Sequence, residues 1–317
     1  MSEKATSHVA FVFPGQGSQY LGMGKLFYET DFQARNLFDS ASDVLGLDLP
    51  SLCFSGPTDR LNLTEYTQPA ILTVSVAALH ALVRSGISPL FVAGHSLGEW
   101  TAVVAAKGIE FSDAVQLVRK RGRYMQEVVG TGHGVVAAVL GVSRDAIIES
   151  CQIASRLGVV CPANFNTPRQ VVIAGETIAV EEALRLIHEQ YKGRSVRLPI
   201  SVPVHTPLMQ KAAERLAVDL DSVNISDLEV PLVNNVHAKA IQSRHDVRAS
   251  LLSQLPSPVL WEDSIRALVS MGVNVIIEIG PGPVLSRLVK NITSQAEVFS
   301  VYDPESLHSV IEDVAHG

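Results

Sequence analysis

Three times along this 317-residue chain, a short apolar run ends in a bend that contains glycine. The three segments are VAFVFPGQGSQ at 9–19, LFVAGHS at 90–96 and VNVIIEIGPGPVLSRLV at 273–289. Short apolar runs with helices between them are typical of a parallel sheet that is buried on both faces. Helical spacing is found between the runs, for example at 68–86 and 112–129. The sequence therefore predicts an α/β fold.

The glycine bends also predict where a functional site lies. In parallel α/β sheets, sites form at the carboxyl ends of the strands. We therefore expect the bends at 15–17, 94–98 and 280–282 to gather at one edge of the sheet.

The middle of the chain has a different pattern. The segment order is β-α-β-β-α-β, which is the split βαβ or ferredoxin-like pattern. The predicted segments are a strand at 134–141, a helix at 143–158 with Ser143 as N-cap, strands at 159–166 and 169–175, a helix at 178–193 and a strand at 194–201. We expect a small domain at 132–199, inserted into a larger domain formed by 1–131 and 200–317.

Composition narrows the classes of partner and the compartment. The formal net charge is −7 and no run of five basic residues occurs, so we expect no nucleic-acid partner. Three cysteines without CxxC spacing predict neither a disulfide framework nor a zinc site, and they fit a reducing compartment. The first eight residues carry no apolar signal segment, and the longest apolar stretch, at 70–83, is too short to span a bilayer. We expect a cytoplasmic protein without membrane contact.

The second bend, Gly94-His95-Ser96-Leu97-Gly98, has the G-x-S-x-G pattern of a nucleophile elbow. In such an elbow, a sharp strand-to-helix turn exposes a serine hydroxyl, and the helix that follows offers free N–H groups to an anion. The alternative is a glycine turn that happens to contain a serine.

A serine nucleophile needs a base, and ten histidines are available. His205 follows an extended, proline-bounded segment and precedes a helix that starts near Pro207. His133, between glycines, is a weaker candidate, and the side chain of His95 should point away from its neighbour Ser96. The pattern alone leaves open whether His205 is the base or a structural histidine.

Several motifs, taken in order, resemble one family closely. They are FVFPGQGSQ, GHSLGEW, RGRYMQE, NFNTPRQVVIAG, SVPVHTPLM, VPLVNNV and EIGPGPVL. The chain resembles the malonyl-CoA:acyl carrier protein transacylases from about Val9 to Val289. The resemblance implies an α/β-hydrolase-like large domain with a ferredoxin-like small domain, in agreement with the pattern of segments.

The resemblance also implies the catalytic residues. Ser96 is the acylated nucleophile, His205 is its base, and the main-chain carbonyl of Gln254 accepts a hydrogen bond from the imidazole. The main-chain N–H groups of Gln16 and Leu97 form the oxyanion hole. Two N–H donors aimed at a developing oxyanion lower the barrier to acyl transfer.

Further residues are expected to bind the acyl group. Arg121 pairs with the free carboxylate of the malonyl group, to which its planar donor fork is complementary. Without the resemblance, Arg121 is an ordinary exposed helix arginine. Met125 and the segment around Asn164 and Asn166 are expected to line the pocket, and Val204 stands where relatives select the substituent on the malonyl unit.

The implied reaction is ping-pong acyl transfer through a malonyl-serine ester, from malonyl-CoA to the phosphopantetheine thiol of acyl carrier protein. It needs no cofactor and no metal, and we expect a monomer. Acyl carrier proteins are acidic, so a local basic patch should receive one. The candidates for it are Lys107, Arg119, Lys120, Arg194, Arg287 and Lys290.

Three alternatives to malonyl supply for fatty acid synthesis stay open. The first is a serine esterase or thioesterase on a related fold. The second is an acyltransferase that serves a polyketide pathway. The third is a carrier-binding module without activity.

Overall fold

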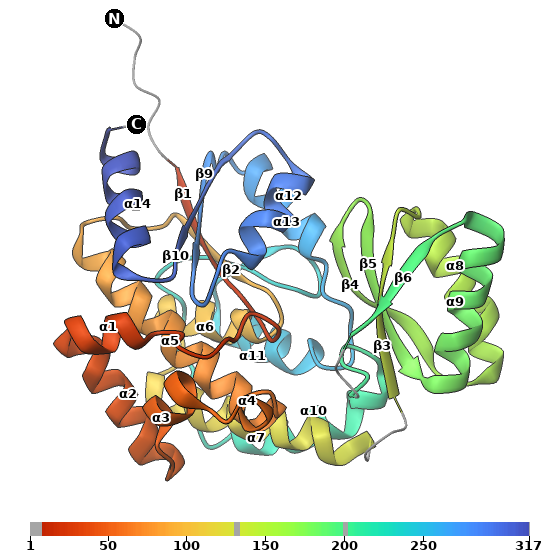
Figure 1. Ribbon diagram of the computed structural model, residues 1–317, viewed down its shortest axis with the longest axis horizontal. Helices are drawn as coiled ribbons and strands as arrows, with labels where there is room; N and C mark the ends of the chain where they lie inside the picture. Colours follow the sequence, from red (N-terminus) through yellow and green to blue (C-terminus); the bar gives the residue numbers. More distant parts are fainter. Residues whose placement is uncertain (1–7, 130–133, 199–201, 317) are drawn as a thin grey trace, which may run out of the picture.

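The computed structural model describes residues 8–129, 134–198 and 202–316, and its elements form two sheets (Figure 1). The larger sheet has six strands, in the order β10 (Glu297–Val301), β9 (Val275–Ile279), β1 (Val9–Phe13), β2 (Phe91–Gly94), β7 (Leu232–Val233) and β8 (Ala240–Ile241). The pairs from β10 to β7 are parallel, and β8 runs antiparallel to β7 at the edge. The predicted mixed α/β class is confirmed, but the sequence pattern did not reveal the antiparallel edge strand.

Helices cover both faces of the larger sheet. They are α1 (Lys25–Thr30), α2 (Phe32–Leu45), α3 (Leu49–Ser55), α4 (Thr58–Leu61), α5 (Thr64–Arg84), α6 (Leu97–Ala105), α7 (Phe111–Val129), the 3-10 helix η2 (Pro207–Met209), α10 (Gln210–Leu220), α11 (Arg244–Ser253), α12 (Trp261–Ser270), α13 (Val284–Ile292) and α14 (Pro304–His316). In Figure 1, α12 and α13 lie on one side of the strands, and α5 and α6 lie on the other.

The central strand β1 shows why two helical layers form. All five of its residues are buried, and successive side chains of a strand point to opposite faces. Phe11 and Phe13 belong to the core cluster that includes α5 and α6, whereas Ala10 and Val12 belong to the cluster of α12 and α13. A continuous apolar run therefore requires cover on both sides.

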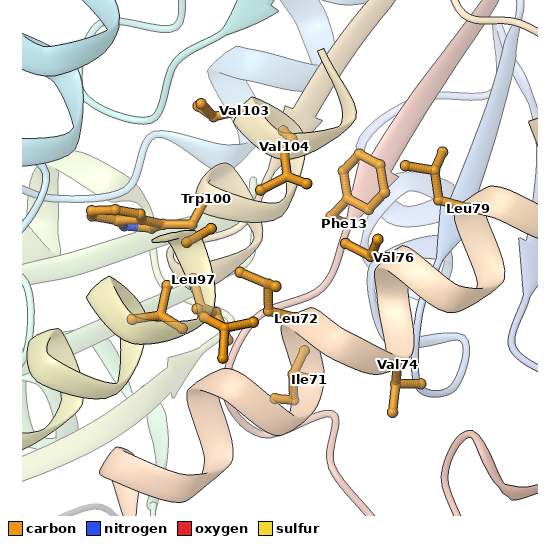
Figure 2. Close-up of a cluster of buried hydrophobic side chains, with 14 of the residues drawn as sticks. Phe13, Ile71, Leu72, Val74, Val76, Leu79, Leu97, Trp100, Val103 and Val104 are labelled. Carbon is orange, nitrogen blue, oxygen red and sulfur yellow. The ribbon is translucent and has the colours of Figure 1, made fainter. Parts of the chain in front are cut away.

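Helix α5 is the innermost helix of the larger core. Figure 2 shows its Leu72 and Val76 beside Leu97 and Trp100 of α6 and Phe13 of β1. By length and composition its 21 residues would suffice to cross a membrane, yet 83% of the apolar window is buried inside the fold. The apolar stretch at 70–83 is therefore not too short, contrary to the prediction, because it belongs to a helix that extends beyond it on both sides. Its burial accounts for its apolar composition.

The smaller sheet follows the predicted segment order. It comprises β3 (Gly134–Leu140), β4 (Val160–Thr167), β5 (Gln170–Glu176) and β6 (Arg194–Arg197), arranged β4-β5-β3-β6 with antiparallel pairs throughout. Helices α8 (Arg144–Ala154) and α9 (Thr177–Tyr191), together with the 3-10 turn η1 (Ser155–Leu157), cover one face. The predicted N-cap is confirmed, since the Ser143 hydroxyl accepts a hydrogen bond from the N–H of Ala146 at 3.4 Å.

The backbone of β4 is hydrogen-bonded to the segment that precedes α12. The N–H of Phe165 donates to the carbonyl of Val259 at 2.9 Å, and the N–H of Val259 donates to the carbonyl of Ala163 at 2.9 Å. Val259 lies just before α12 of the larger layer. These bonds fix β4, which carries Asn164 and Asn166, against the segment that leads into α12. The predicted boundaries at 131/132 and 199/200 lie outside the described residues.

Candidate active site

The three glycine bends lie side by side at the carboxyl ends of β1, β2 and β9, as predicted. A Cβ atom on Gly15 would stand 2.3 Å from the carbonyl oxygen of His95, so the first two bends touch through their backbones. A Cβ atom on Gly280 would stand 2.9 Å from Cγ of Pro14, so the third bend touches the first. The site is therefore built where neighbouring parallel strands end.

The strand-to-helix bend at Ser96 leaves no space for side chains at either flanking glycine. A Cβ atom on Gly94 would lie 1.9 Å from the carbonyl carbon of Gly98, and one on Gly98 would lie 1.9 Å from the carbonyl oxygen of Phe13. Ser96 itself has φ 53° and ψ −108°, a strained conformation for a residue with a side chain. The two glycines are needed for this close approach, and the bend directs the serine away from the sheet.

A cavity of about 170 Å³ opens in front of Ser96. All but one of the predicted site residues line it, from both parts of the chain. They are Gln16, Ser96, Leu97, Arg121, Met125, Asn164, Asn166 and His205. The remaining one, Gln254, is fully buried behind His205.

Ser96, His205 and Gln254 form a hydrogen-bonded chain. The distance from Ser96 Oγ to His205 Nε2 is 2.7 Å, and His205 Nδ1 lies 2.9 Å from the main-chain carbonyl oxygen of Gln254. A carbonyl can only accept, so Nδ1 carries the proton, and in the neutral ring Nε2 is free to accept the proton of the serine hydroxyl. This is the arrangement of an activated serine nucleophile, with a carbonyl in place of a carboxylate.

The surroundings of His205 keep its ring neutral. The side chain is 1% exposed, and burial together with the charge of Arg121 lowers its pKa to about 3, while the Gln254 carbonyl acts in the opposite direction. His205 is therefore unprotonated near neutral pH and is ready to accept a proton. Its backbone has φ 60°, so His205, like Ser96, is held in a strained conformation.

Arg121 is buried beside the serine, so the alternative of an exposed helix arginine is wrong. Its Nη2 donates to Ser96 Oγ at 3.3 Å and to Gln254 Oε1 at 2.9 Å, and its Nη1 donates to Gln68 Oε1 at 2.9 Å. Burial lowers its pKa to about 10, opposed by the negative charge of Glu99, so the guanidinium stays charged at neutral pH. A buried cation next to a nucleophile is suited to binding an acyl group that carries a carboxylate.

The predicted oxyanion donors lie on the bend after β1, which holds Gln16, and on the bend after β2, which holds Ser96 itself. Leu97 is the first residue of α6, where helical N–H groups have no intrahelical acceptor. Gln16 lies in the turn after β1, and its side-chain Nε2 donates to Thr64 Oγ1 at 3.2 Å. The side chain of Gln16 is thereby anchored to the start of α5.

The predicted pocket residues come from α7 and β4. Met125 Sδ accepts a hydrogen bond from Gln68 Nε2 at 3.5 Å, and Asn166 Oδ1 lies 2.9 Å from His95 Nε2. His95 is thus paired with Asn166 and not with Ser96 Oγ, as expected from its direction. Asn164 lines the same wall, beside the apolar residues Val136, Val172 and Leu198 of the small sheet region.

The sequence reasoning missed the residues that support the site from below. Asn235 Oδ1 accepts the Ser96 N–H at 2.8 Å, and its Nδ2 donates to the Gly94 carbonyl at 2.6 Å, so one amide holds both sides of the bend. Glu99 is buried below it, and Gln68 orients Arg121. Glu99 and Asn235 stand in the motifs GHSLGEW and VPLVNNV, but nothing in these motifs indicates that they meet.

The alternative base His133 lies outside the described residues. Within the described ranges, no group of three or more His, Cys, Asp and Glu residues is arranged to hold a metal ion, and the three cysteines are unpaired.

The chain is similar to known acyltransferases over nearly its whole length. A family model described as acyl transferase domain matches residues 10–309. A Bacillus subtilis (strain 168) malonyl CoA-acyl carrier protein transacylase is 45% identical over 307 residues, which cover 96% of this chain and 97% of that protein. The Escherichia coli (strain K12) protein of the same name is 42% identical over 304 residues, 96% of this chain and 98% of that one.

Solved structures agree with these similarities. A Streptococcus pneumoniae MCAT structure superposes with a TM-score of 0.92 at 46% identity, covering 96% of this chain and 99% of that chain. A second structure, of a malonyl-transacylase in complex with a holo type II PKS acyl-carrier protein, gives a TM-score of 0.94 at 41% identity, covering 97% and 100%.

Proposed function

Since the chain belongs to the malonyl CoA-acyl carrier protein transacylase family, we propose that it transfers the malonyl group of malonyl-CoA to the phosphopantetheine thiol of an acyl carrier protein. It is an acyltransferase that supplies fatty acid synthesis. The observation that carries the proposal is the juxtaposition, in one cavity, of a serine–histidine pair and a buried arginine that donates to the same serine oxygen.

The first half-reaction loads the serine. Arg121 binds the free carboxylate of the malonyl group and thereby orients the thioester carbonyl. His205 Nε2 takes the proton of Ser96 Oγ as this oxygen attacks the carbonyl carbon. The N–H groups of Gln16 and Leu97 stabilise the oxyanion. The carbon–sulfur bond then breaks, and the coenzyme A sulfur receives the proton from His205.

The second half-reaction unloads the serine by the same steps in reverse. His205 takes a proton from the phosphopantetheine thiol, the sulfur attacks the malonyl-serine ester, and Ser96 recovers its proton. Ser96, His205 and the two thiols account for every proton transfer and for every bond that forms or breaks. We therefore propose that no cofactor or metal is needed.

The electrostatics of the pocket fit a substrate with a carboxylate. Without substrate, the positive charge of Arg121 holds the pKa of His205 down. A malonyl carboxylate bound to Arg121 offsets that charge, so the pKa of His205 rises and the ring becomes a stronger base. The neutral Gln254 carbonyl orients His205 without adding a negative charge near this anion.

The carrier protein must approach from the open side of the cavity. Helix α13 contributes Val284, Leu285 and Leu288 to its wall, and Arg287 and Lys290 are exposed on the same helix. We propose these two basic residues as contacts for an acidic carrier protein. A carrier of a polyketide pathway is the alternative partner, since a structural relative was solved with one.

We also propose the finer description of the fold. The larger sheet and its helices, residues 1–131 and 200–317, form an α/β-hydrolase-like domain, and residues 132–199 form an inserted ferredoxin-like domain. Separate core clusters under the two sheets support this division. We further propose a monomer in the cytoplasm without membrane contact, in keeping with three unpaired cysteines.

Intact-protein mass after mixing with malonyl-CoA tests the function. We expect one malonyl adduct on each chain, no adduct in the Ser96→Ala variant, and loss of the adduct when holo acyl carrier protein is added. Formation of no adduct contradicts the proposal. Removal of the adduct by water as fast as by the carrier thiol indicates a thioesterase instead.

A further inference from the structure

Glu99 is a buried carboxylate that none of the catalytic steps uses. It lies on α6, one turn after Ser96, and is 0% exposed. Its oxygens accept hydrogen bonds from Ser250 Oγ at 2.6 Å, from Gln254 Nε2 at 2.8 Å and from the N–H of Asn235 at 3.1 Å. Burial raises the pKa of Glu99, whereas these three donors and the positive charge of Arg121 act in the opposite direction. The donors favour the ionised form, because ionised oxygens only accept.

Arg121 is a buried cation without a carboxylate partner. It is 1% exposed, its hydrogen-bond partners Gln68, Ser96 and Gln254 are neutral, and its Nε has no partner within the described part of the chain. A buried charge without compensation is costly. The charge that compensates Arg121 must therefore act from further away.

The side chain of Gln254 lies between these two charges. Its Nε2 donates to Glu99, and its Oε1 accepts from Arg121. Only one orientation of the amide satisfies both, because the opposite one would turn N–H groups toward the guanidinium and an oxygen toward the carboxylate. Glu99 thus fixes which end of the amide faces Arg121.

We propose that Glu99 is a positioning residue, which acts as the counter-ion of Arg121 through the Gln254 amide. Its charge weakens the binding of an acyl carboxylate to Arg121. Glu99 keeps the unliganded pocket electrically balanced. The negative charge of Glu99 also repels the malonyl carboxylate when the substrate binds. The malonyl group is therefore bound but can be released to the carrier. The effect of Glu99 on the substrate rests on the proposed function, whereas the pairing of Glu99 with Arg121 does not.

The Glu99→Gln variant isolates the charge. The N–H of Asn235 requires an acceptor at the position of Glu99 Oε2, so the new amide oxygen takes that place and still accepts from Gln254. The Ser250 hydroxyl can rotate and accept from the new NH₂ group. The hydrogen bonds are therefore kept while the negative charge is removed.

A double-mutant cycle on urea unfolding tests the ion pair without any substrate. In the wild-type background, we expect Glu99→Gln to raise the unfolding equilibrium constant about tenfold, since two charges separated by one amide interact strongly in a buried site. In the Arg121→Ala background, the same change should be neutral or stabilising, because it then removes an uncompensated charge. Equal destabilisation in both backgrounds overturns the proposal.

Glu278→Gln is a matched control for burial. Glu278 is also 0% exposed, and it accepts three backbone N–H bonds at the start of α13. No described hydrogen bond links it to Arg121. The Glu278→Gln change should raise the unfolding equilibrium constant by the same factor in the wild-type and the Arg121→Ala backgrounds. This result distinguishes charge coupling from the general effect of altering a buried carboxylate.

A kinetic comparison tests the effect on substrate. We expect Glu99→Gln to raise the ratio of kcat/KM for malonyl-CoA to that for acetyl-CoA by roughly three- to tenfold, because one repulsion of the malonyl carboxylate is gone. A purely structural defect lowers both values together and leaves the ratio unchanged. An unchanged ratio overturns the proposal. If the wild type forms no malonyl adduct, the proposed function fails, and the unfolding cycle alone then decides whether Glu99 and Arg121 are coupled.

Discussion

Two helices begin at the same edge of the larger sheet, and their first turns are used in opposite ways. Helix α6 follows β2, helix α13 follows β9, and the first residues of both line the same cavity. Both are entered through a glycine-containing bend. The free N–H groups of a helix start carry partial positive charge, so either helix could in principle receive an anion.

The first turn of α13 is closed by its own strand. The buried carboxylate of Glu278, on β9, accepts from the N–H groups of Val284 at 3.0 Å, Leu285 at 2.8 Å and Ser286 at 2.7 Å. This internal anion occupies the positive end of the helix. The start of α13 can therefore form only a wall of the pocket.

The first turn of α6 is left open only at its first N–H group. The N–H groups of Gly98 and Glu99 donate to the carbonyls of His95 at 2.9 Å and Ser96 at 3.0 Å, whereas no described hydrogen bond occupies the N–H of Leu97. Its N-cap residue is Ser96, whose side chain makes no capping hydrogen bond and points to His205 instead. A strand–glycine–helix unit thus keeps a free serine hydroxyl at its helix start when the capping side chain is directed elsewhere. The same unit with an internal acid is structural.

The largest effect should come from removing His205, the proposed base of Ser96. We expect His205→Ala to slow the loading of Ser96 by malonyl-CoA at least about 10³-fold, since an unassisted serine is a poor nucleophile. Rapid-quench measurement of the malonyl adduct gives the rate. Gln254→Ala keeps the main-chain carbonyl that holds His205, so it should cost clearly less than His205→Ala. Equal losses contradict the role given to that carbonyl.

The next largest effect concerns the cation beside the open helix. Arg121→Ala should lower kcat/KM for malonyl-CoA about 10²-fold, because a desolvated contact between a guanidinium and a carboxylate is lost. Acetyl-CoA has no carboxylate, so its transfer should be preserved or improved. Steady-state rates with both thioesters measure the effect, and an equal loss on both would refute the carboxylate contact.

At the closed helix, the expected effect is on stability. Glu278→Gln should lower the free energy of unfolding by about 1–3 kcal/mol, because one of the three N–H donors then meets an NH₂ group. The variant should still form one malonyl adduct on each chain. Urea unfolding and intact mass check the two statements, and loss of the adduct in a folded variant would mean that α13 does more than form a wall.

The smallest effect near neutral pH is in the pH dependence of stability. The pKa of His205 is about 3 in the folded chain, below its ordinary value of 6.5, so the unfolded chain binds more protons between these values. Stability is therefore complete above pH 6.5 and falls as the pH decreases toward 3, by about 1 kcal/mol between pH 6.5 and 5.5. His205→Asn should lack this contribution.

Glu278, which caps the start of α13, should make stability depend on pH in the opposite direction. Burial raises the pKa of Glu278, so the folded chain binds more protons than the unfolded chain just above the ordinary value, and stability falls as the pH rises through that range. Urea titrations of the wild type, His205→Asn and Glu278→Gln at several pH values separate the two contributions. Parallel curves for all three proteins would contradict both assignments.

The local elements could be predicted because short-range chemistry determines them. Apolar runs gave β1, β2 and β9, helical spacing gave α5 and α7, and a serine N-cap located the start of α8. The edge strand β8 was missed because its two residues carry no periodic signal. The length of α5 was underestimated because the polar residues near its start are buried like the apolar ones.

The site could be predicted only in part. The G-x-S-x-G spacing indicated Ser96 by itself, since two glycines around a serine serve one local bend. His205 was one of several histidines, and 109 positions separate it from Ser96. Arg121 looked like a surface arginine. No local pattern in the sequence indicates that Gln68, Glu99 and Asn235 support the site.

By itself, therefore, the amino-acid sequence determined the alternating strands and helices, the sharp bend at Ser96 and the class of fold, because each of these depends on residues a few positions apart. Only the tertiary structure decided which helix start is open, which histidine meets the serine, and that Glu99 and Arg121 share Gln254. The last two of these depend on contacts between residues 109 to 155 positions apart, and burial gives their charges and hydrogen bonds an effect that they would not have in water.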